Sequence, residues 1–333
     1  MRPAIHKSLR KSFRVHRSIS KLVNAMLGPS GHKSPPSRRT TLQTIAMCES
    51  NPAGLVMKLF APTKLRKKPP LVVVPHGCNQ TPESLDAASG FSRYATERGF
   101  VLLYPQQTGS NNPNGCFNWF RPSAVARDRG EVLSIRQMIE QACSRYGVDR
   151  RRVFIVGLSA GGAMTAALVA HYPALFAGAA IVAGMPFGSV RDAMSALRAM
   201  KSGAPVPVAG WGSLVEDLSD QGSSWPPMSI WQGTGDKVVN PRNAEANVAQ
   251  WLEAAGMDRS LGRVERKAWG ELHIWEVAKK RKVSLYLISG MGHALPIKTR
   301  SNGASRRFRD PFVRSAGISA PVELMRLWGL TRL

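Results

Sequence analysis

Ser159 is the residue of this 333-residue chain whose neighbours most suggest a chemical role. It stands in the pentapeptide GLSAG, residues 157–161, after the apolar run RRVFIV and before the small-residue stretch AMTAALVAHY. A Gly-x-Ser-x-Gly segment between a strand and a helix is typical of a nucleophilic serine on a sharp turn, where the glycines let neighbouring backbone approach. A serine packed into a tight strand-to-helix corner has the same local sequence. The pentapeptide alone leaves both interpretations open.

A serine hydroxyl is a weak nucleophile unless a base takes its proton and a third group orients that base. Asp236, in WQGTGDKVVN, and His293, in ISGMGHAL, each follow a predicted strand directly. Active sites in open α/β sheets form at the carboxyl ends of the strands, and serine, acid, histidine is one of the orders in which such triads occur. We therefore predict a triad of Ser159, Asp236 and His293.

Other residues are weaker candidates for the same roles. Asp236 also fits an ordinary aspartate in a turn, which is common. Three other acids follow no clear core strand: Asp192, Asp217 and Asp220. Five other histidines occupy a helix end, a strand pattern or the basic N-terminal segment: His171, His273, His6, His16 and His32.

The negative oxygen that develops during acyl transfer needs backbone N–H donors. One is expected from Ala160, the residue after the nucleophile, and the other from the loop that follows the strand LVVVP. That loop begins His76-Gly77-Cys78, so the Cys78 N–H is the second candidate, and His76 is expected to orient or pack rather than to act as a base. A plain strand-to-helix turn is the alternative interpretation of this loop.

The surrounding elements alternate in a way that would position these residues. Strand patterns occupy residues 41–50, 54–63, 69–77, 100–106, 151–158, 175–184 and 227–233, and two more strands joined by a basic turn occupy 271–294. Helical patterns occupy residues 84–99, 130–147, 160–171, 189–200, 243–256 and 320–329. Strands that alternate with helices predict an α/β protein with a mostly parallel, doubly wound sheet and no large cap domain.

The charge of the chain is strongly positive, with 46 Lys and Arg against 21 Asp and Glu, a net charge of +25. Ten of the basic residues precede residue 42, and no acid occurs before Glu49. We expect residues 1–40 to form a basic, flexible extension and residues 41–333 to form the catalytic domain. The extension lacks the apolar core of a secretory signal, and no apolar run reaches the ~20 residues of a membrane span. A basic surface favours an anionic partner, although a solvated face explains the same charges.

Several ordered motifs together resemble the polyhydroxybutyrate-depolymerase-type esterase family, which also includes feruloyl and acetylxylan esterases. They are PLVVVPHGCNQTPESL, YPQQ, GCFNWFRP, RVFIVGLSAGGAMTAALVAHYPALFAGAAIVAGMPFG, WQGTGD and GMGHA, and the resemblance spans roughly residues 71–294. The resemblance implies an α/β-hydrolase fold and hydrolysis of carboxylic esters. The family's nucleophile, acid and base fall on Ser159, Asp236 and His293. Such chemistry needs no metal or organic cofactor, and the four cysteines show no CxxC spacing of the kind found in zinc sites.

The resemblance also suggests features of the substrate site. Cys78 and Cys116 occupy positions that are paired beside the active site in such enzymes, and two free thiols are the alternative here. Trp119 is expected to line the acyl pocket, although an ordinary core residue would fit its pattern. Polyhydroxybutyrate or its 3-hydroxybutyrate oligomers are the expected substrates. The alternative substrates are feruloyl or acetyl esters on plant polysaccharide. A third interpretation is that the protein is not an enzyme but a basic binding protein. The family suggests an extracellular protein, whereas the absence of a visible signal peptide suggests a cytoplasmic one.

The segment after His293 departs from the family pattern. Residues 295–297 are Leu-Pro-Ile, where such family members usually have an aromatic residue and small polar residues. The rest of that region is basic, from Lys298 to Arg314. We expect this departure to affect substrate preference and not the chemistry.

Overall fold

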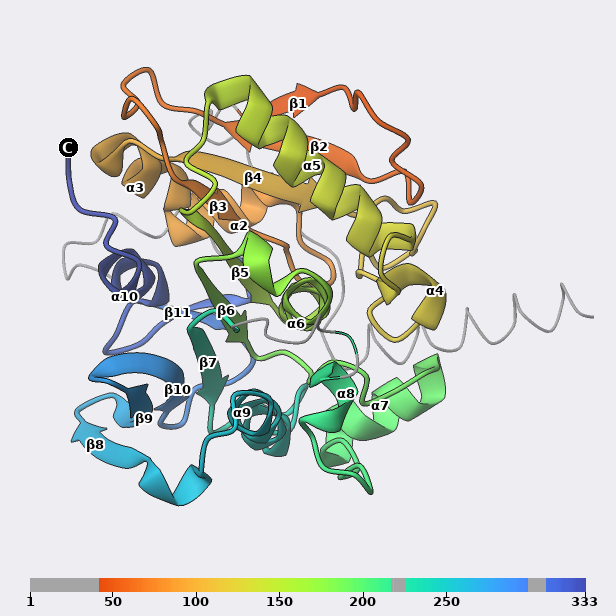
Figure 1. Cartoon of the computed structure of the whole chain (residues 1–333), viewed down its shortest axis with the longest axis vertical. Helices are drawn as coiled ribbons and strands as arrows, with labels where there is room; N and C mark the ends of the chain where they lie inside the picture. The colour runs from red at the N-terminus through yellow and green to blue at the C-terminus, as the bar shows by residue number, and fades with distance from the viewer. Residues whose placement is uncertain (1–41, 217, 219–224, 299–309) are drawn as a thin grey trace, which may run out of the picture.

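The computed structural model describes residues 42–216, 218, 225–298 and 310–333. The expected N-terminal extension therefore lies outside the described residues. Ten strands form one sheet in the order β1-β2-β4-β3-β5-β6-β7-β10-β9-β8 (Figure 1). Their bounds are β1 Gln43–Ile45, β2 Val56–Phe60, β3 Leu71–Val73, β4 Val101–Gln106, β5 Val153–Leu158, β6 Gly178–Val182, β7 Met228–Gly233, β8 Arg263–Lys267, β9 Gly270–Val277 and β10 Lys280–Ile288.

The middle of the sheet is parallel and its two ends are antiparallel. Strands β4, β3, β5, β6, β7 and β10 all run in the same direction, whereas β1 and β2 at one end and β9 and β8 at the other pair antiparallel. Strands β3, β5, β6 and β7 are buried along their whole length. Strands covered by helices on both faces must be apolar along their whole length. The predicted mostly parallel sheet is confirmed.

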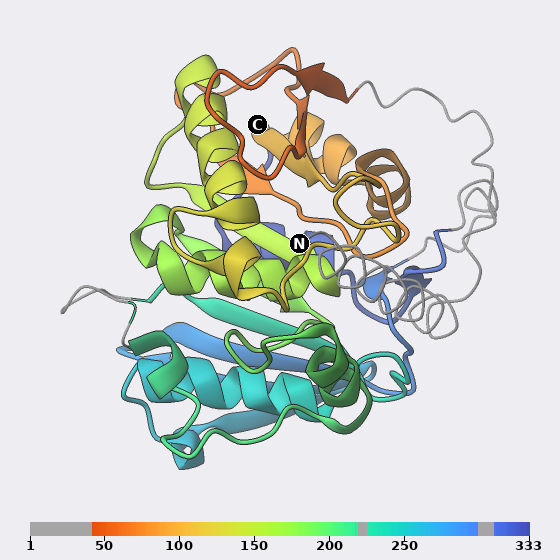
Figure 2. The ribbon, with the colours of Figure 1, turned by 90° about the vertical axis from the view of Figure 1, so that its right-hand side faces the viewer.

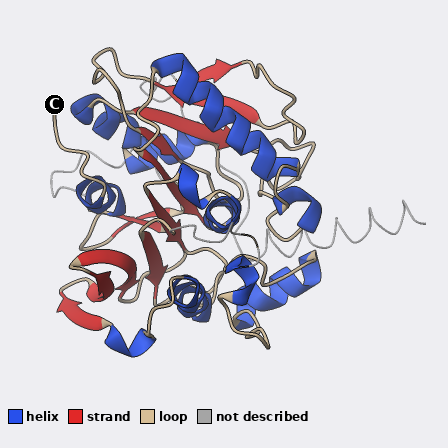
Figure 3. Ribbon diagram, viewed as in Figure 1, coloured by secondary structure: helices blue, strands red, loops and turns tan. Residues whose placement is uncertain are grey.

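Helices cover both faces of the sheet, giving three layers (Figure 3). On one face, α5 (Gly130–Tyr146), α6 (Ala160–His171) and α9 (Arg242–Ala254) pack against side chains such as Ile155 and Ile230. In Figure 1, α6 and α9 lie to the right of β6 and β7, and α5 overlaps β2 in the view; all three helices face the viewer in Figure 2. On the other face, α2 (Pro82–Ser89), α3 (Phe91–Arg98) and α10 (Ala320–Leu327) pack against Val156 and Trp231.

The remaining short elements lie in the connections. They are α4 Pro122–Val125, α7 Ala193–Ser202, α8 Ser213–Glu216, the 3-10 turns Pro173–Leu175 and Arg259–Leu261, and a parallel pair of strands, β11 Leu295–Ile297 and β12 Val313–Ser315. Within the described ranges, no helix is long and apolar enough to cross a membrane, and no cluster of metal-binding side chains occurs.

The structure differs from the predicted elements in several places. The strand pattern expected over residues 41–50 is strand only at Gln43–Ile45, and α4, α8, β11 and β12 were not predicted. The single helix expected over residues 84–99 is two helices, because Gly90 adopts a left-handed conformation (φ 76°) that ends α2 and begins α3. The carboxylate of Asp86 accepts the Ser92 N–H at this break, at 2.8 Å. Strand β8 was not predicted, since its sequence RVERK is charged and mostly exposed at the sheet edge.

Candidate active site

Ser159 lies at the junction of β5 and α6, in a backbone conformation that few residues other than glycine adopt (φ 56°, ψ −117°). Glycines make this turn possible. A Cβ on Gly157 would lie 2.0 Å from the carbonyl oxygen of Gly161, and a Cβ on Gly161 would lie 2.1 Å from that of Pro75. Gly162 similarly lets α6 approach the sheet, because a Cβ there would lie 3.1 Å from the Val182 carbonyl. Strain of this kind is concentrated at functional sites, which favours the nucleophile interpretation over simple packing.

Asp236 and His293 lie after β7 and β10, two neighbouring parallel strands. Nδ1 of His293 is 2.8 Å from Oδ2 of Asp236, and both side chains are almost completely buried. The other carboxylate oxygen, Oδ1, accepts the backbone N–H groups of Val238 and Val239. Burial raises the pKa of Asp236, but the hydrogen bond and charge of His293 and the two backbone N–H groups outweigh it, so the pKa lies below its ordinary value.

His293 thus has one ring nitrogen bonded and one available. Nε2 of His293 is buried and has no hydrogen-bond partner in the described part of the chain. The structure therefore joins Asp236 to His293 and leaves the histidine without a hydrogen bond to Ser159. In enzymes without substrate such bonds are often long and shorten only in the complex.

The competing candidates from the sequence lie elsewhere. Asp192 caps the N-terminus of α7, and Asp217 and Asp220 lie outside the described residues. His171 is buried at the end of α6 against Phe187. His273 lies on β9 beside Glu271.

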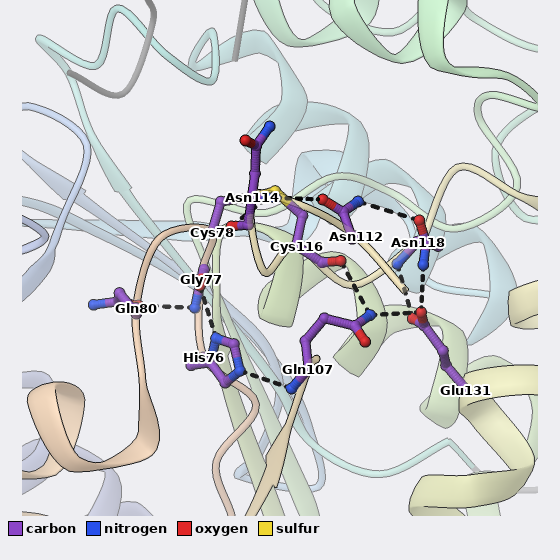
Figure 4. Close-up of a disulfide and its surroundings, with 10 residues drawn as sticks. All are labelled: His76, Gly77, Cys78, Gln80, Gln107, Asn112, Asn114, Cys116, Asn118 and Glu131. Atoms are coloured by element: carbon purple, nitrogen blue, oxygen red, sulfur yellow. Dashed lines mark hydrogen bonds between the residues drawn. A yellow bond between two sulfur atoms is a disulfide. The ribbon is translucent and has the colours of Figure 1, made fainter. Parts of the chain in front are cut away.

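Hydrogen bonds from His76, Gln80 and Gln107 hold the loop after β3 in place (Figure 4). His76 Nδ1 donates to the Gly77 carbonyl at 2.8 Å, and its Nε2 accepts the Gln107 backbone N–H at 3.1 Å. The Gly77 N–H donates to the side-chain oxygen of Gln80. These bonds engage both ring nitrogens of His76, as expected for an orienting residue. Within the described residues, the N–H groups of Cys78 and Ala160 donate no hydrogen bond.

Burial lowers the pKa of His76 to about 4, although the Gly77 hydrogen bond and the charge of Glu83 act in the opposite direction. The unfolded chain therefore binds a proton at this residue between pH 6.5 and pH 4 that the folded chain does not bind. We expect the free energy of unfolding to fall across this range by about 3 kcal/mol more in the wild type than in His76→Asn.

Urea unfolding at several pH values between 7 and 4 measures this difference. His76→Asn keeps an amide in place of Nδ1–H and does not titrate, so contributions from other groups cancel in the comparison. Equal slopes for the two proteins would show that His76 is not held neutral.

Cys78 and Cys116 form a disulfide bond, as the resemblance suggested, with their Cα atoms 4.3 Å apart (Figure 4). The bond joins the loop after β3 to the loop that carries Trp119. Cys48 and Cys143 are free, the first exposed and the second buried.

A pocket with a cavity volume of about 70 Å³ opens beside Ser159, Ala160 and the disulfide. Trp119 and Phe120 line it, and a role of Trp119 in binding the acyl group stays a prediction. The opposite wall comes from α7, whose pocket-facing residues are Ala193, Ala196, Leu197 and Met200. Asn112, Asn114 and Arg121 supply polar groups. Its lining is mainly apolar with a few polar groups, as in small-molecule sites.

Sequence reasoning missed the α7 wall and the polar residues beneath the loop. Helix α7 has an ordinary amphipathic pattern that gives no sign of a pocket. Gln232 directly follows the apolar residues Ile230 and Trp231. A buried polar residue in such a segment was the available signal, because it must be hydrogen-bonded. Gln107 and Glu131 have polar neighbours in the sequence and gave no such signal.

Comparison with known proteins agrees with this architecture. The acetyl xylan esterase from Aspergillus awamori superposes with a TM-score of 0.72 at 24% identity, over 87% of this chain and 100% of that one. The strand order and this match establish the fold as that of an α/β hydrolase.

Residues 55–271 match the family described as Esterase PHB depolymerase, and the chain belongs to this family. Poly(3-hydroxyalkanoate) depolymerase C of Paucimonas lemoignei is 37% identical over 250 residues, which are 74% of this chain and 60% of that protein. Feruloyl esterase B of Neurospora crassa is 29% identical over 265 residues, 77% of this chain and 89% of that protein. These relatives are named as carboxylic ester hydrolases, and the chain spans 60% of the first relative's length.

Proposed function

We propose that this protein is a serine esterase that hydrolyses carboxylic esters through an acyl-enzyme, with Ser159 as nucleophile, His293 as base and Asp236 as the orienting acid. One observation carries the proposal: His293 is bonded to Asp236 through Nδ1, and its Nε2 has no hydrogen-bond partner among the residues that the structure describes. This pair lies at the same sheet edge where β5 presents Ser159 on a strained turn. A base needs this arrangement, since the bond at Nδ1 fixes the proton there and leaves Nε2 to accept one.

The first half of the proposed reaction forms the acyl-enzyme. Ser159 Oγ attacks the ester carbonyl while Nε2 of His293 takes the hydroxyl proton, and the Cys78 and Ala160 N–H groups hold the negative oxygen. The imidazolium returns the proton to the leaving alcohol as the carbonyl re-forms. In the second half, water attacks the acyl-enzyme while His293 takes one of its protons. The imidazolium then gives that proton to Ser159 Oγ as the bond between Oγ and the acyl carbon breaks, and the acid product leaves.

For the substrate we propose polyhydroxybutyrate or its 3-hydroxybutyrate oligomers. Support comes from the 37% identity to a poly(3-hydroxyalkanoate) depolymerase and from a pocket wall of non-aromatic apolar residues on α7, which suits short aliphatic acyl chains. Feruloyl or acetyl esters of plant polysaccharide are the second candidate, because feruloyl esterase B of Neurospora crassa is also a relative.

A panel of three substrates separates these candidates: polyhydroxybutyrate, soluble 3-hydroxybutyrate trimer and methyl ferulate. We expect kcat/KM for the trimer to exceed that for methyl ferulate by about tenfold or more, because a pocket shaped for one acyl group discriminates by such factors. A preference for methyl ferulate would instead support the feruloyl esterase. The Ser159→Ala variant is the blank for each substrate.

We propose an extracellular location over a cytoplasmic one. Disulfides persist in oxidising compartments and are rare in the cytosol, and the Cys78–Cys116 bond lies in the proposed site itself. Detection of the protein in the medium of producing cells supports this location, and its retention in the soluble cell fraction would contradict it.

A further inference from the structure

Glu131 is a buried carboxylate that the proposed mechanism does not use. It lies in the first turn of α5 and its residue surface is 2% exposed. Burying an ionisable group is costly unless hydrogen bonds compensate, so its contacts indicate what it does.

Three N–H groups point at the Glu131 carboxylate (Figure 4). Oε1 accepts from the side-chain amides of Asn118 and Gln107, each at 2.7 Å. Oε2 accepts the backbone N–H of Asn118 at 2.8 Å. All three partners donate, which matches an ionised carboxylate because that group only accepts. Burial raises the pKa of Glu131, and the bonds from Asn118 and Gln107 oppose this rise.

Gln107 connects this carboxylate to the loop that carries Cys78. Its side-chain amide also donates to the Cys116 carbonyl at 3.1 Å, and its amide oxygen accepts the Thr108 N–H and the Asn111 side chain. Its backbone N–H donates to Nε2 of His76. The orientation of Gln107 is therefore fixed at both its side chain and its backbone.

His76 passes this orientation to the peptide that joins Gly77 to Cys78. Its Nδ1 donates to the Gly77 carbonyl oxygen, which belongs to the same planar peptide unit as the Cys78 N–H. In a trans peptide these two groups point in opposite directions, so holding the carbonyl fixes the direction of the N–H. A second connection runs through the loop of Cys116, where the Asn114 carbonyl accepts the Asn79 N–H at 2.8 Å.

We propose that Glu131 is a positioning residue for the oxyanion hole, acting through Gln107 and His76 to aim the Cys78 N–H at the reacting carbonyl oxygen. The proposal rests on the proposed serine esterase function. Glu131 then stabilises the transition state and not the bound substrate, because the oxyanion forms only during the reaction. Its loss should therefore lower kcat and leave KM nearly unchanged.

The variant Glu131→Gln tests the proposal with a nearly unchanged shape. A glutamine has one acceptor oxygen and one NH₂ group, so in either orientation its NH₂ faces at least one of the three donors. The backbone N–H of Asn118 cannot turn, so the conflict falls on the side-chain amides, including Gln107. We expect kcat for p-nitrophenyl butyrate to fall about 10- to 100-fold with KM within about threefold of wild type, less than the complete loss of one oxyanion donor.

Inactivation by diethyl p-nitrophenyl phosphate supplies a second readout, since its phosphoryl oxygen occupies the same hole. The second-order rate constant should fall in parallel with kcat. Glu140→Gln is the matched control, because Glu140 lies on the same helix but is partly exposed and pairs with Arg150. Its kcat should stay within about twofold of wild type. If Glu131→Gln is not recovered folded, Gln107→Met carries the test, because it removes the amide and keeps the backbone N–H to His76.

The outcomes are distinct. A folded Glu131→Gln protein with wild-type kcat overturns the proposal, as does a loss confined to KM or one that leaves the inactivation rate unchanged. If Gln107→Met is used instead, wild-type kcat, a loss confined to KM or an unchanged inactivation rate likewise overturns the proposal. Activity retained by Ser159→Ala would instead remove the serine mechanism on which the proposal rests.

Discussion

Ser159→Ala is expected to lower kcat for p-nitrophenyl butyrate by about 10⁴- to 10⁶-fold. The reason is that Oγ is the atom proposed to form the acyl-enzyme, and alanine has no replacement for it. The fold should persist. Alanine keeps the Cβ that the turn already accommodates at φ 56°, and the Ser159 N–H still donates to the Val182 carbonyl at 2.8 Å.

Steady-state kinetics measures the loss of kcat, and thermal unfolding checks that the fold persists. Ser260→Ala is the matched control, because Ser260 lies in the exposed turn Arg259–Leu261 and takes no part in the candidate active site. In the wild type, diethyl p-nitrophenyl phosphate should add its phosphoryl group to the peptide that contains Ser159, as read by mass spectrometry. Appreciable turnover by Ser159→Ala, or labelling at another serine, would refute the nucleophile.

The sequence was sufficient to predict the backbone frame of the candidate site because that frame depends on local signals. The glycines around Ser159 are required by contacts of about 2 Å that any Cβ would make. Asp236 and His293 were predicted because each follows an apolar strand directly, and parallel strands place such residues at one edge. The bond between Nδ1 of His293 and Asp236 agrees with that expectation.

The parts that could not be predicted depend on contacts distant in sequence. Glu131 and Gln107 meet because α5 packs beside β4, and neither residue carries a pattern that specifies its partner. The α7 wall depends on how the chain after β6 returns over the sheet edge. Gly90 was read as part of one helix, since a single glycine within a helical pattern does not by itself indicate a break.

Asp236→Asn is expected to lower kcat by about 10⁴-fold while the fold remains intact. The carboxylate accepts four N–H groups, two on each oxygen. Oδ1 accepts the backbone N–H groups of Val238 and Val239, and Oδ2 accepts Nδ1–H of His293 and the side-chain amide of Gln232. In the variant, the amide oxygen must stay with the backbone N–H groups, because these cannot turn. The new NH₂ group then faces His293.

A donor at this position reverses the preferred tautomer of His293. Nδ1 would have to accept a hydrogen bond, so the ring proton moves to Nε2, which can then no longer accept the proton of Ser159. We therefore expect kcat to fall with KM nearly unchanged, as initial-rate kinetics on p-nitrophenyl butyrate would show. Asp192→Asn is the control, because asparagine also caps a helix N-terminus well and Asp192 caps α7. If Asp236→Asn kept kcat within tenfold of wild type while Asp192→Asn lost it, the acid would be Asp192. If neither variant lost it, the same substitution at Asp217 and Asp220 would decide between the remaining acids.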